Sequence, residues 1–229
     1  MATLLLRLAG PMQSWGTTSR FDERDTQLEP SKSGVLGLLC AALGRDRAEP
    51  VDDLARLRMG VRVDREGLLM RDYQTATGVL VAADAKPDLG RTVVSPRFYL
   101  ADAVFLVGLE SMDGQVLAML NVALLAPHWP LCLGRKSLVP SLPVGLGKSA
   151  GLHAGLLETA LAEHPRIATP RREHQGLPLR CMLEHPNEGA LRHDQPIAPF
   201  AARRFGPRFV KSGVLDHVPE PAQTEPGTA

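Results

Sequence analysis

The stretch LLLRLAGPMQSWGTTSRFDERDTQLEPSKSGVLGLLCAALG, residues 4–44, decides the fold. It opens with an apolar run, residues 3–9, which is too short to cross a bilayer and has the length of a buried strand. Gly10 and Pro11 end that strand, because proline lacks the amide donor that a sheet needs. A polar loop follows, which carries Trp15 and two arginines, Arg20 and Arg24.

A helix is predicted after this loop. Pro30 indicates the start of this helix, and Ser31 or Ser33 can accept hydrogen bonds from the free amides of its first turn. Gly44 stands where a left-handed C-terminal cap is expected. The apolar residues recur at helical spacing and predict one buried face, formed by Val35, Leu38, Leu39 and Ala42.

The later elements follow from periodicity. Residues 59–63 alternate apolar and polar side chains, which predicts a half-buried strand, and residues 68–77 predict its partner. Residues 101–110 indicate a central strand and residues 115–125 a second helix. Residues 131–147 would supply the last strand of a β-α-β-β-α-β, ferredoxin-like unit, so the predicted class is α+β.

Composition shifts predict how the chain is organised. We expect a ferredoxin-like domain over residues 1–147 and a smaller, β-rich C-terminal part over residues 148–216. Residues 78–97 form an insert with two β-branched runs around a polar tip, which favours a projecting hairpin or a mobile loop. Residues 152–163 are helical in period, and residues 217–229 lack apolar periodicity and are expected to be disordered.

Charge and cysteine content narrow the class of protein. The chain has 229 residues and a formal net charge of only +1, so its total charge does not indicate a nucleic-acid binder. Its positive charge is carried by 21 arginines and 5 lysines, although a GC-rich coding bias also enriches arginine. Three scattered cysteines, no leader and no apolar run of spanning length favour a reduced, cytoplasmic protein without a membrane segment.

Catalytic and metal motifs are missing from the sequence. The histidines and cysteines have no ligand spacing such as HxxxH or CxxC, so no metal site or cofactor is expected. Ser137 and Ser149 lie near glycines but lack a GxSxG elbow, and Cys40 is expected in the core. The chain is therefore predicted not to be an enzyme.

Two stretches could bind phosphate. Ser31, Lys32 and Ser33 lie at a helix start, where free amides attract an anion, although, taken alone, an ordinary cap with a solvated lysine is the better explanation. Arg135 and Lys136 lie between glycines, which allow a backbone to approach a ligand closely. The alternative for this second pair is an exposed turn.

Aromatic residues beside arginines form a further group of candidates. Such pairs can stack on unpaired bases, or they can belong to an amphipathic strand with its arginines outward. Trp15 is either a stacking platform or a hydrophobic lid, and Tyr73 either a functional phenol or a strand aromatic. The other candidates are Arg20 and Arg24 in the first polar loop and, near the C-terminus, Arg203, Arg204 and Arg208.

Several motifs together resemble one family. LRLAGPMQSWG (residues 6–16) and PSKSGVLGLLCAALG (30–44) are its most specific matches, and RRFGPRFVKSG (203–213) matches loosely. The other three are RDYQTATG (71–78), FYLADAVFLVGL (98–109) and LCLGRKS (131–137). The sequence resembles the CasD family, a subunit of type I-E CRISPR Cascade within the RAMP superfamily.

The resemblance implies a fold and a function. The expected fold is an RRM-related, ferredoxin-like domain with a β-hairpin thumb at residues 78–97, and the expected function is non-catalytic binding of the 5′ handle of CRISPR RNA. The implied partners are a CasC-like backbone subunit and a CasA-like large subunit, while target DNA is met only through the complex. Ser31, Lys32 and Ser33 would meet handle phosphates, Arg135 and Lys136 would form a basic loop, and Arg91 and Arg97 would line the thumb base.

Two other functions stay open. Type I-C relatives cut precursor CRISPR RNA without a metal, and Tyr73, His128 and Lys136 are the candidate acid and base groups here. An α/β enzyme that holds a small phosphorylated ligand at Ser31–Gly34 is the third reading. It lacks a nucleophile, a metal motif and a cofactor fingerprint.

Overall fold

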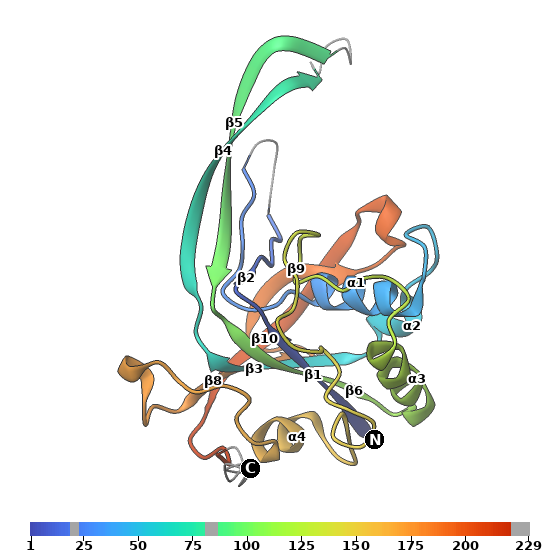
Figure 1. The fold of residues 1–229 in the computed structure, drawn as a ribbon. Coiled ribbons are helices and arrows are strands. Elements are labelled where there is room, and N and C mark those ends of the chain that lie inside the picture. The colour runs from blue at the N-terminus through green and yellow to red at the C-terminus, as the bar shows by residue number, and fades with distance from the viewer. Residues whose placement is uncertain (19–22, 81–86, 221–229) are drawn as a thin grey trace, which may run out of the picture.

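The computed structural model describes residues 1–18, 23–80 and 87–220 (Figure 1). The strands of the main sheet are β1 (Ala2–Ala9), β3 (Arg58–Arg65), β6 (Val104–Ser111), β7 (Leu152–His153), β8 (Leu179–His185), β9 (Ala190–Pro196) and β10 (Phe205–Leu215). The helices are α1 (Lys32–Leu43), α2 (Asp52–Ala55), α3 (Gly114–Leu125) and α4 (Leu157–Glu163). The main sheet has the order β7-β1-β6-β3-β8-β10-β9. The predicted α+β class is confirmed.

Four of these strands follow the order that a β-α-β-β-α-β unit requires. β7, β1, β6 and β3 are neighbours and pair antiparallel, with α1 between β1 and β3 and α3 between β6 and β7. The fourth strand was predicted wrongly. Residues 131–147 contain Pro140 and Pro143 and run irregularly beside β1, where the Arg7 amide donates to the Val144 carbonyl.

The fourth strand is instead β7, only two residues long, and the helix predicted over residues 152–163 therefore begins at Leu157.

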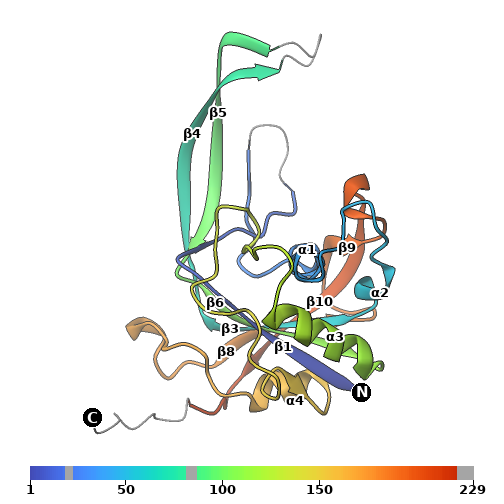
Figure 2. The same ribbon diagram turned by 45° about the vertical axis from the view of Figure 1, so that its right-hand side comes forward.

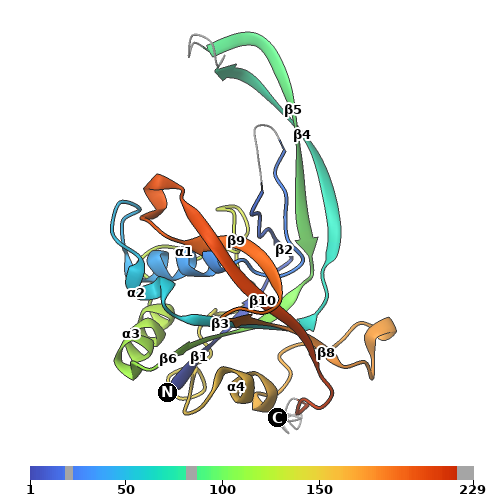
Figure 3. The same cartoon turned by 180° about the vertical axis from the view of Figure 1, so that it is seen from behind.

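The C-terminal strands continue the same sheet. β8 pairs with β3, placing Leu183 opposite Gly60, and β10 lies between β8 and β9. Figure 3 shows these orange and red strands from behind, crossing the molecule beside α1. Of the tail predicted from His217, residues 217–220 are described, and the carbonyl of Pro219 accepts from the Arg166 amide. Residues 221–229 lie outside the described residues.

Helices cover both faces of the main sheet. α1 and α3 pack on one face over Leu4, Leu6 and Leu8 of β1, and α4 packs on the other, against Leu5 and Leu106 (Figure 1). Because both faces are covered, the expected outward-facing side chains of β3 are buried too.

The half-buried assignment of β3 was thus wrong. Arg62 and Asp64 are fully buried and pair with each other, and Arg62 also donates to the carbonyls of Leu161 and His164 at the end of α4. Burial of both charges is tolerated because each is paired and hydrogen-bonded.

The predicted caps of α1 are confirmed. Ser31 is the N-cap, and its hydroxyl oxygen accepts from the Gly34 amide at 3.3 Å. Gly44 has φ +71° and ends the helix in the left-handed conformation.

Replacing Ser31 with alanine should lower the free energy of unfolding by about 1 kcal/mol, because the Gly34 amide loses its acceptor. Urea unfolding at equilibrium measures this change. Ser33→Ala is the matched control, since the one hydrogen bond of the Ser33 hydroxyl in the described part of the chain is its contact with the Ser31 hydroxyl at 3.5 Å. An equal loss in both variants would argue against the capping role.

A long hairpin projects from the body. Strands β4 (Leu68–Leu80) and β5 (Pro87–Ala101) pair in a three-stranded sheet with β2 (Met12–Gln13), in the order β2-β5-β4. Figure 2 shows this hairpin standing away from the main sheet. It is longer than the predicted insert 78–97, because the strand predicted at 68–77 forms its first arm. We call β4 and β5 the thumb hairpin; its tip, residues 81–86, lies outside the described residues.

Candidate nucleic-acid interface

The start of α1 is already occupied by carboxylates. The Lys32 amide donates to Asp194 Oδ2 at 2.8 Å, and Lys32 Nζ lies 2.9 Å from both carboxylate oxygens of Glu184. The Lys32 side chain is buried, and burial lowers its pKa despite the opposing effect of Glu184. The predicted phosphate site at Ser31, Lys32 and Ser33 is therefore corrected: the helix start does attract an anion, but the anion belongs to the protein.

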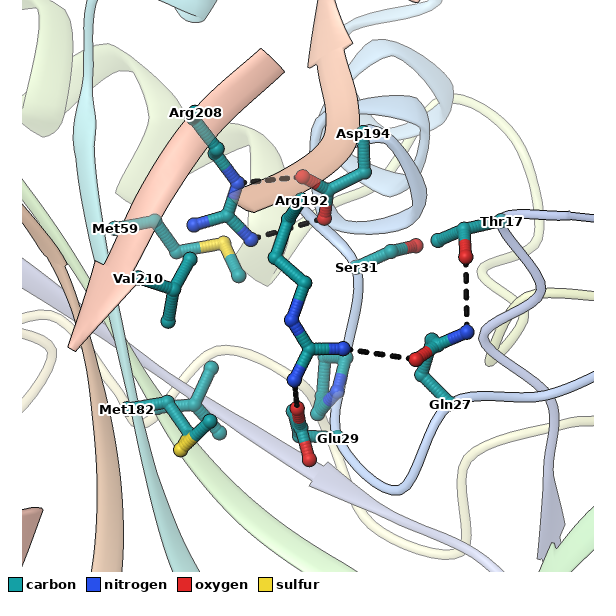
Figure 4. A pocket seen from close by; sticks show the side chains of 12 residues that line it. Thr17, Gln27, Glu29, Ser31, Met59, Met182, Arg192, Asp194, Arg208 and Val210 are labelled. Atoms are coloured by element: carbon teal, nitrogen blue, oxygen red, sulfur yellow. Dashed lines mark hydrogen bonds and ion pairs between the residues drawn. The ribbon is translucent and has the colours of Figure 1, made fainter. Parts of the chain in front are cut away.

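Arg208, a predicted RNA contact, pairs with the same carboxylate. Its Nε and Nη2 atoms donate to Asp194 at 2.6 and 2.9 Å, as Figure 4 shows. In the pocket drawn there, Arg192 donates to Gln27 and Glu29. Both arginines of this pocket thus face a carboxylate, which removes Arg208 from the candidate RNA contacts.

Burial and pairing act in opposite directions on Asp194. Burial alone would raise the pKa of its carboxyl group, but hydrogen bonds and charge from Arg208 and the Lys32 amide bring the pKa below the ordinary 3.8. Because the folded state favours the ionised carboxylate, Asp194 stabilises the fold at pH values above its ordinary pKa. This stabilisation is lost as the pH falls through the lower pKa of the folded state.

Acid unfolding should therefore report on Asp194. We expect the urea midpoint of the unmodified chain to fall as the pH drops below about 4, and Asp194→Asn to be less stable at pH 7 with a shallower acid dependence. Other carboxylates titrate in the same range, so the difference between the two chains is the quantity to measure. Parallel pH profiles for the two would contradict this role of Asp194.

Trp15 belongs to the core. Its indole Nε1 donates to Gln13 Oε1 at 3.1 Å, and its ring packs so closely on Gly34 that a Cβ there would lie 2.8 Å from it. The ring has no face open to a base in this conformation, so the stacking-platform interpretation of Trp15 is corrected. Arg20 lies outside the described residues.

Arg135 joins three segments at the base of the thumb hairpin. Its Nη2 donates to the carbonyls of Arg24, Asp25 and Phe98, and its guanidinium lies 4.5 Å from the centre of the Tyr99 ring. Gly134 makes this possible, since it has φ +94° and a Cβ there would lie 1.7 Å from the Ser14 carbonyl oxygen. The neighbouring Lys136 is exposed.

Two guanidinium groups at the thumb base have a buried N–H donor without an acceptor in the described residues. Nε of Arg97 and Nη1 of Arg135 are buried and have no hydrogen-bond partner within the described residues. Arg24 lies beside them, because its backbone bridges Arg97 and its carbonyl also accepts from the Phe98 amide. Three predicted contacts thus come together, and we call Arg24, Arg97 and Arg135 the thumb-base cluster.

One face of the thumb hairpin is exposed and carries a cation and aromatic rings. Arg71 and Tyr73 share this face, and Phe98 lies opposite Arg71, 6.0 Å from its guanidinium carbon. Tyr73 is 67% exposed, and Arg91 is exposed further out on β5. Arg71, Phe98 and Tyr99 were not among the predicted contacts, although the period-two pattern of both arms could have placed Arg71 beside Tyr73.

The remaining predicted contacts lie elsewhere. Arg203 and Arg204 are exposed after the short 3-10 helix η2 (Phe200–Ala202), which touches the turn after α1 through a bond from the Ala201 amide to the Arg47 carbonyl. Among the described residues, no hydrogen bond or ion pair joins them to the thumb-base cluster.

The described residues contain no group of three histidines, cysteines or carboxylates that could hold a metal ion. No helix in the described part of the chain combines the length and apolarity that a bilayer crossing requires.

Comparison with known proteins gives the class. The family model described as "CRISPR-associated protein (Cas_Cas5)" matches residues 3–211, so the chain belongs to the CRISPR-associated Cas5 family. The chain is 36% identical over 163 residues to "CRISPR system Cascade subunit CasD" of Escherichia coli (strain K12), which covers 63% of this chain and 70% of that protein.

Two solved structures are similar throughout. The structure titled "Crystal structure of Cas protein" is 49% identical to this chain, with a TM-score of 0.76. The match covers 95% of this chain and 98% of the chain in that structure. A chain of the structure titled "CRISPR RNA-guided surveillance complex" is 32% identical, with a TM-score of 0.78. The match covers 94% of this chain and 90% of that one.

Proposed function

We propose that this chain is a non-catalytic subunit of a Cascade-type CRISPR surveillance complex and binds the 5′ handle of the CRISPR RNA. The observation that carries the proposal is the thumb-base cluster. Within residues 1–18, 23–80 and 87–220, two of its guanidinium groups keep N–H donors without a partner, in a chain of the Cas5 family. Its similarity to the CasD subunit of Escherichia coli supports the same assignment.

The chemistry of the thumb hairpin suits single-stranded RNA. Guanidinium groups donate to phosphate oxygens in a fixed geometry, and exposed aromatic rings can stack on unpaired bases. Arg97 of the thumb-base cluster, Arg71 and Tyr73 belong to the hairpin itself, and Arg24 and Arg135 lie against its base, so both kinds of group occur along one hairpin. We therefore assign the handle phosphates to the base of the hairpin and an unpaired base to its exposed face.

The geometry gives the ribonuclease alternative little support. Tyr73 lies on the thumb hairpin, whereas His128 packs against Gly44 at the end of α1. Lys136 lies in the loop after Gly134. Among the described residues no hydrogen bond links any two of these three side chains, and Tyr73 and His128 belong to separate parts of the fold.

Partners and location follow from the same proposal. A CasC-like backbone subunit and a CasA-like large subunit would hold the chain, target DNA would be met only through the assembled complex, and the complex would work in the cytoplasm. The protein supplies shape and backbone contacts in such an assembly, while base pairing reads the target.

Binding and cleavage should be measured together. The purified chain is incubated with labelled repeat RNA and with mature guide RNA in chelator, across a salt series. Salt-dependent binding that prefers the 5′ handle, without cleavage, supports the proposal. Cleavage at one position, lost in Tyr73→Phe or His128→Ala, would replace it with RNA processing, and binding that ignores the handle would overturn it.

A further inference from the structure

The surface of α3 is unusual because it has no charge. Residues 114–134 contain no aspartate, glutamate, lysine or arginine, while 22% of the whole chain is charged. The inner side of α3 packs into the core through Leu117, Leu120 and Leu124. A helix at a protein surface normally turns charged or polar residues to the other side. The exposed residues of α3 are instead Gly114, Gln115, Ala118, Met119, Val122 and Leu125, of which only Gln115 is polar.

The outer side of α3 is apolar and exposed. Met119, Val122 and Leu125 are 44, 66 and 39% exposed and follow one another at intervals of three, and Trp129, just beyond the helix, is 55% exposed. We call these four residues the α3 patch. Figure 2 shows α3 on the outside of the molecule, across the main sheet from α4. Within the described residues, no other helix or strand covers the side chains of the α3 patch.

Trp129 is held in place by α1. Its amide donates to the Ala41 carbonyl, and the neighbouring His128 amide donates to the Ala42 carbonyl, at 3.0 and 2.9 Å. The two rings meet edge to face with their centres 4.8 Å apart. An exposed aromatic residue on a fixed backbone loses little freedom when it is buried by a partner, so it can act as an anchor.

The composition of the α3 patch indicates what covers it. RNA needs cations near its phosphates, and residues 114–134 supply none. The C-terminal sequence PAQTEPGTA, residues 221–229, has no large apolar side chain to bury there. A stable dimer of two copies buries about 20–30 residues on each side, far more than this patch offers, so its occupant must be held by other contacts as well.

We propose that the α3 patch is a protein–protein docking face, which receives an uncharged, apolar surface of another protein subunit in the same complex. Interface cores are enriched in tryptophan and methionine and depleted in charged residues, as this patch is. The inference rests on the proposed function, and it separates two sides of the chain. The thumb hairpin meets RNA, and α3 meets protein.

The test is Val122→Glu, assembled with the other subunits and guide RNA produced from the same CRISPR locus. Glutamate forms helices at least as well as valine, so the free chain should keep its stability, while a charge in the centre of the patch should reduce incorporation at least about tenfold. Native mass spectrometry of complexes purified through another subunit gives the occupancy. Val214→Glu is the matched control, because Val214 is 61% exposed on β10.

Each outcome decides between the occupants. Loss of incorporation in Val122→Glu alone, with handle binding by the free chain unchanged, supports the docking face. Normal incorporation overturns it, as does a loss of RNA binding in Val122→Glu, which would make the patch an RNA platform. A free chain that is dimeric, and monomeric as Val122→Glu, would assign the patch to a second copy. If the unmodified chain neither incorporates nor binds the handle, the proposed function itself has failed.

Discussion

Changing Arg97 to glutamate should weaken binding of the RNA handle by about 10- to 100-fold. The expected loss corresponds to one charge-assisted hydrogen bond of about 1.5–3 kcal/mol, because Arg97 is only partly buried at the thumb base and its Nε has no partner in the described residues. The glutamate would also repel the phosphate. Fluorescence anisotropy with labelled handle RNA across a salt series measures both effects.

The salt dependence makes this prediction specific. If Arg97 neutralises one phosphate of a single strand, the neutral variant Arg97→Ala should reduce the slope of log affinity against log salt by about 0.7. Arg56→Ala is the control, since it removes one exposed arginine at the end of α2, away from the thumb hairpin. Equal slopes for Arg97→Ala and the unmodified chain would remove Arg97 from the interface.

Replacing Asp64 with alanine should destabilise the fold by about 3–5 kcal/mol, because it leaves the buried Arg62 guanidinium without its counter-charge. Asp64 also accepts from the Ile167 amide at 2.7 Å, so that donor would be left unpaired as well. Urea unfolding at pH 7 measures the change. Glu188→Ala, which breaks the exposed pair with Lys211, should have little effect.

The double variant Arg62→Met with Asp64→Leu tests the explanation. If the cost comes from an unpaired buried charge, removing both charges should recover much of the stability that Asp64→Ala loses. Part of the loss should remain, because Arg62 also donates to carbonyls at the end of α4. A double variant less stable than Asp64→Ala would show that the carbonyl contacts outweigh the ion pair.

Local signals in the sequence predicted the elements well. The spacing of apolar residues, a serine before them and a glycine after them were enough for α1, because these signals act within a few residues. The burial of those β3 side chains that face α4 could not be predicted from such local signals. Arg62 and Asp64 look like outward-facing residues until α4, about a hundred positions later, covers them.

The candidate site was predicted only in part. A helix start with a lysine predicts an anion, but the sequence does not say whether the anion is a phosphate or Asp194, which lies 162 residues away. Arginines raise the same difficulty, since Arg208 and Arg135 carry equal charge and only their partners separate them. Arg208 faces a carboxylate, whereas Arg135 faces carbonyls and keeps Nη1 unpaired within the described residues.

The continuous main sheet has a consequence for how the chain folds. β3 is synthesised early, yet its second neighbour is β8, more than a hundred residues later. Gly60 therefore cannot pair with Leu183 until β8 has been synthesised. Until β8 arrives, β3 presents an open edge to any other extended chain. Pairings this distant in sequence form slowly, and we therefore expect a nascent or truncated chain that ends before β8 to aggregate. Assembly of the complex would then depend on chains whose synthesis is complete.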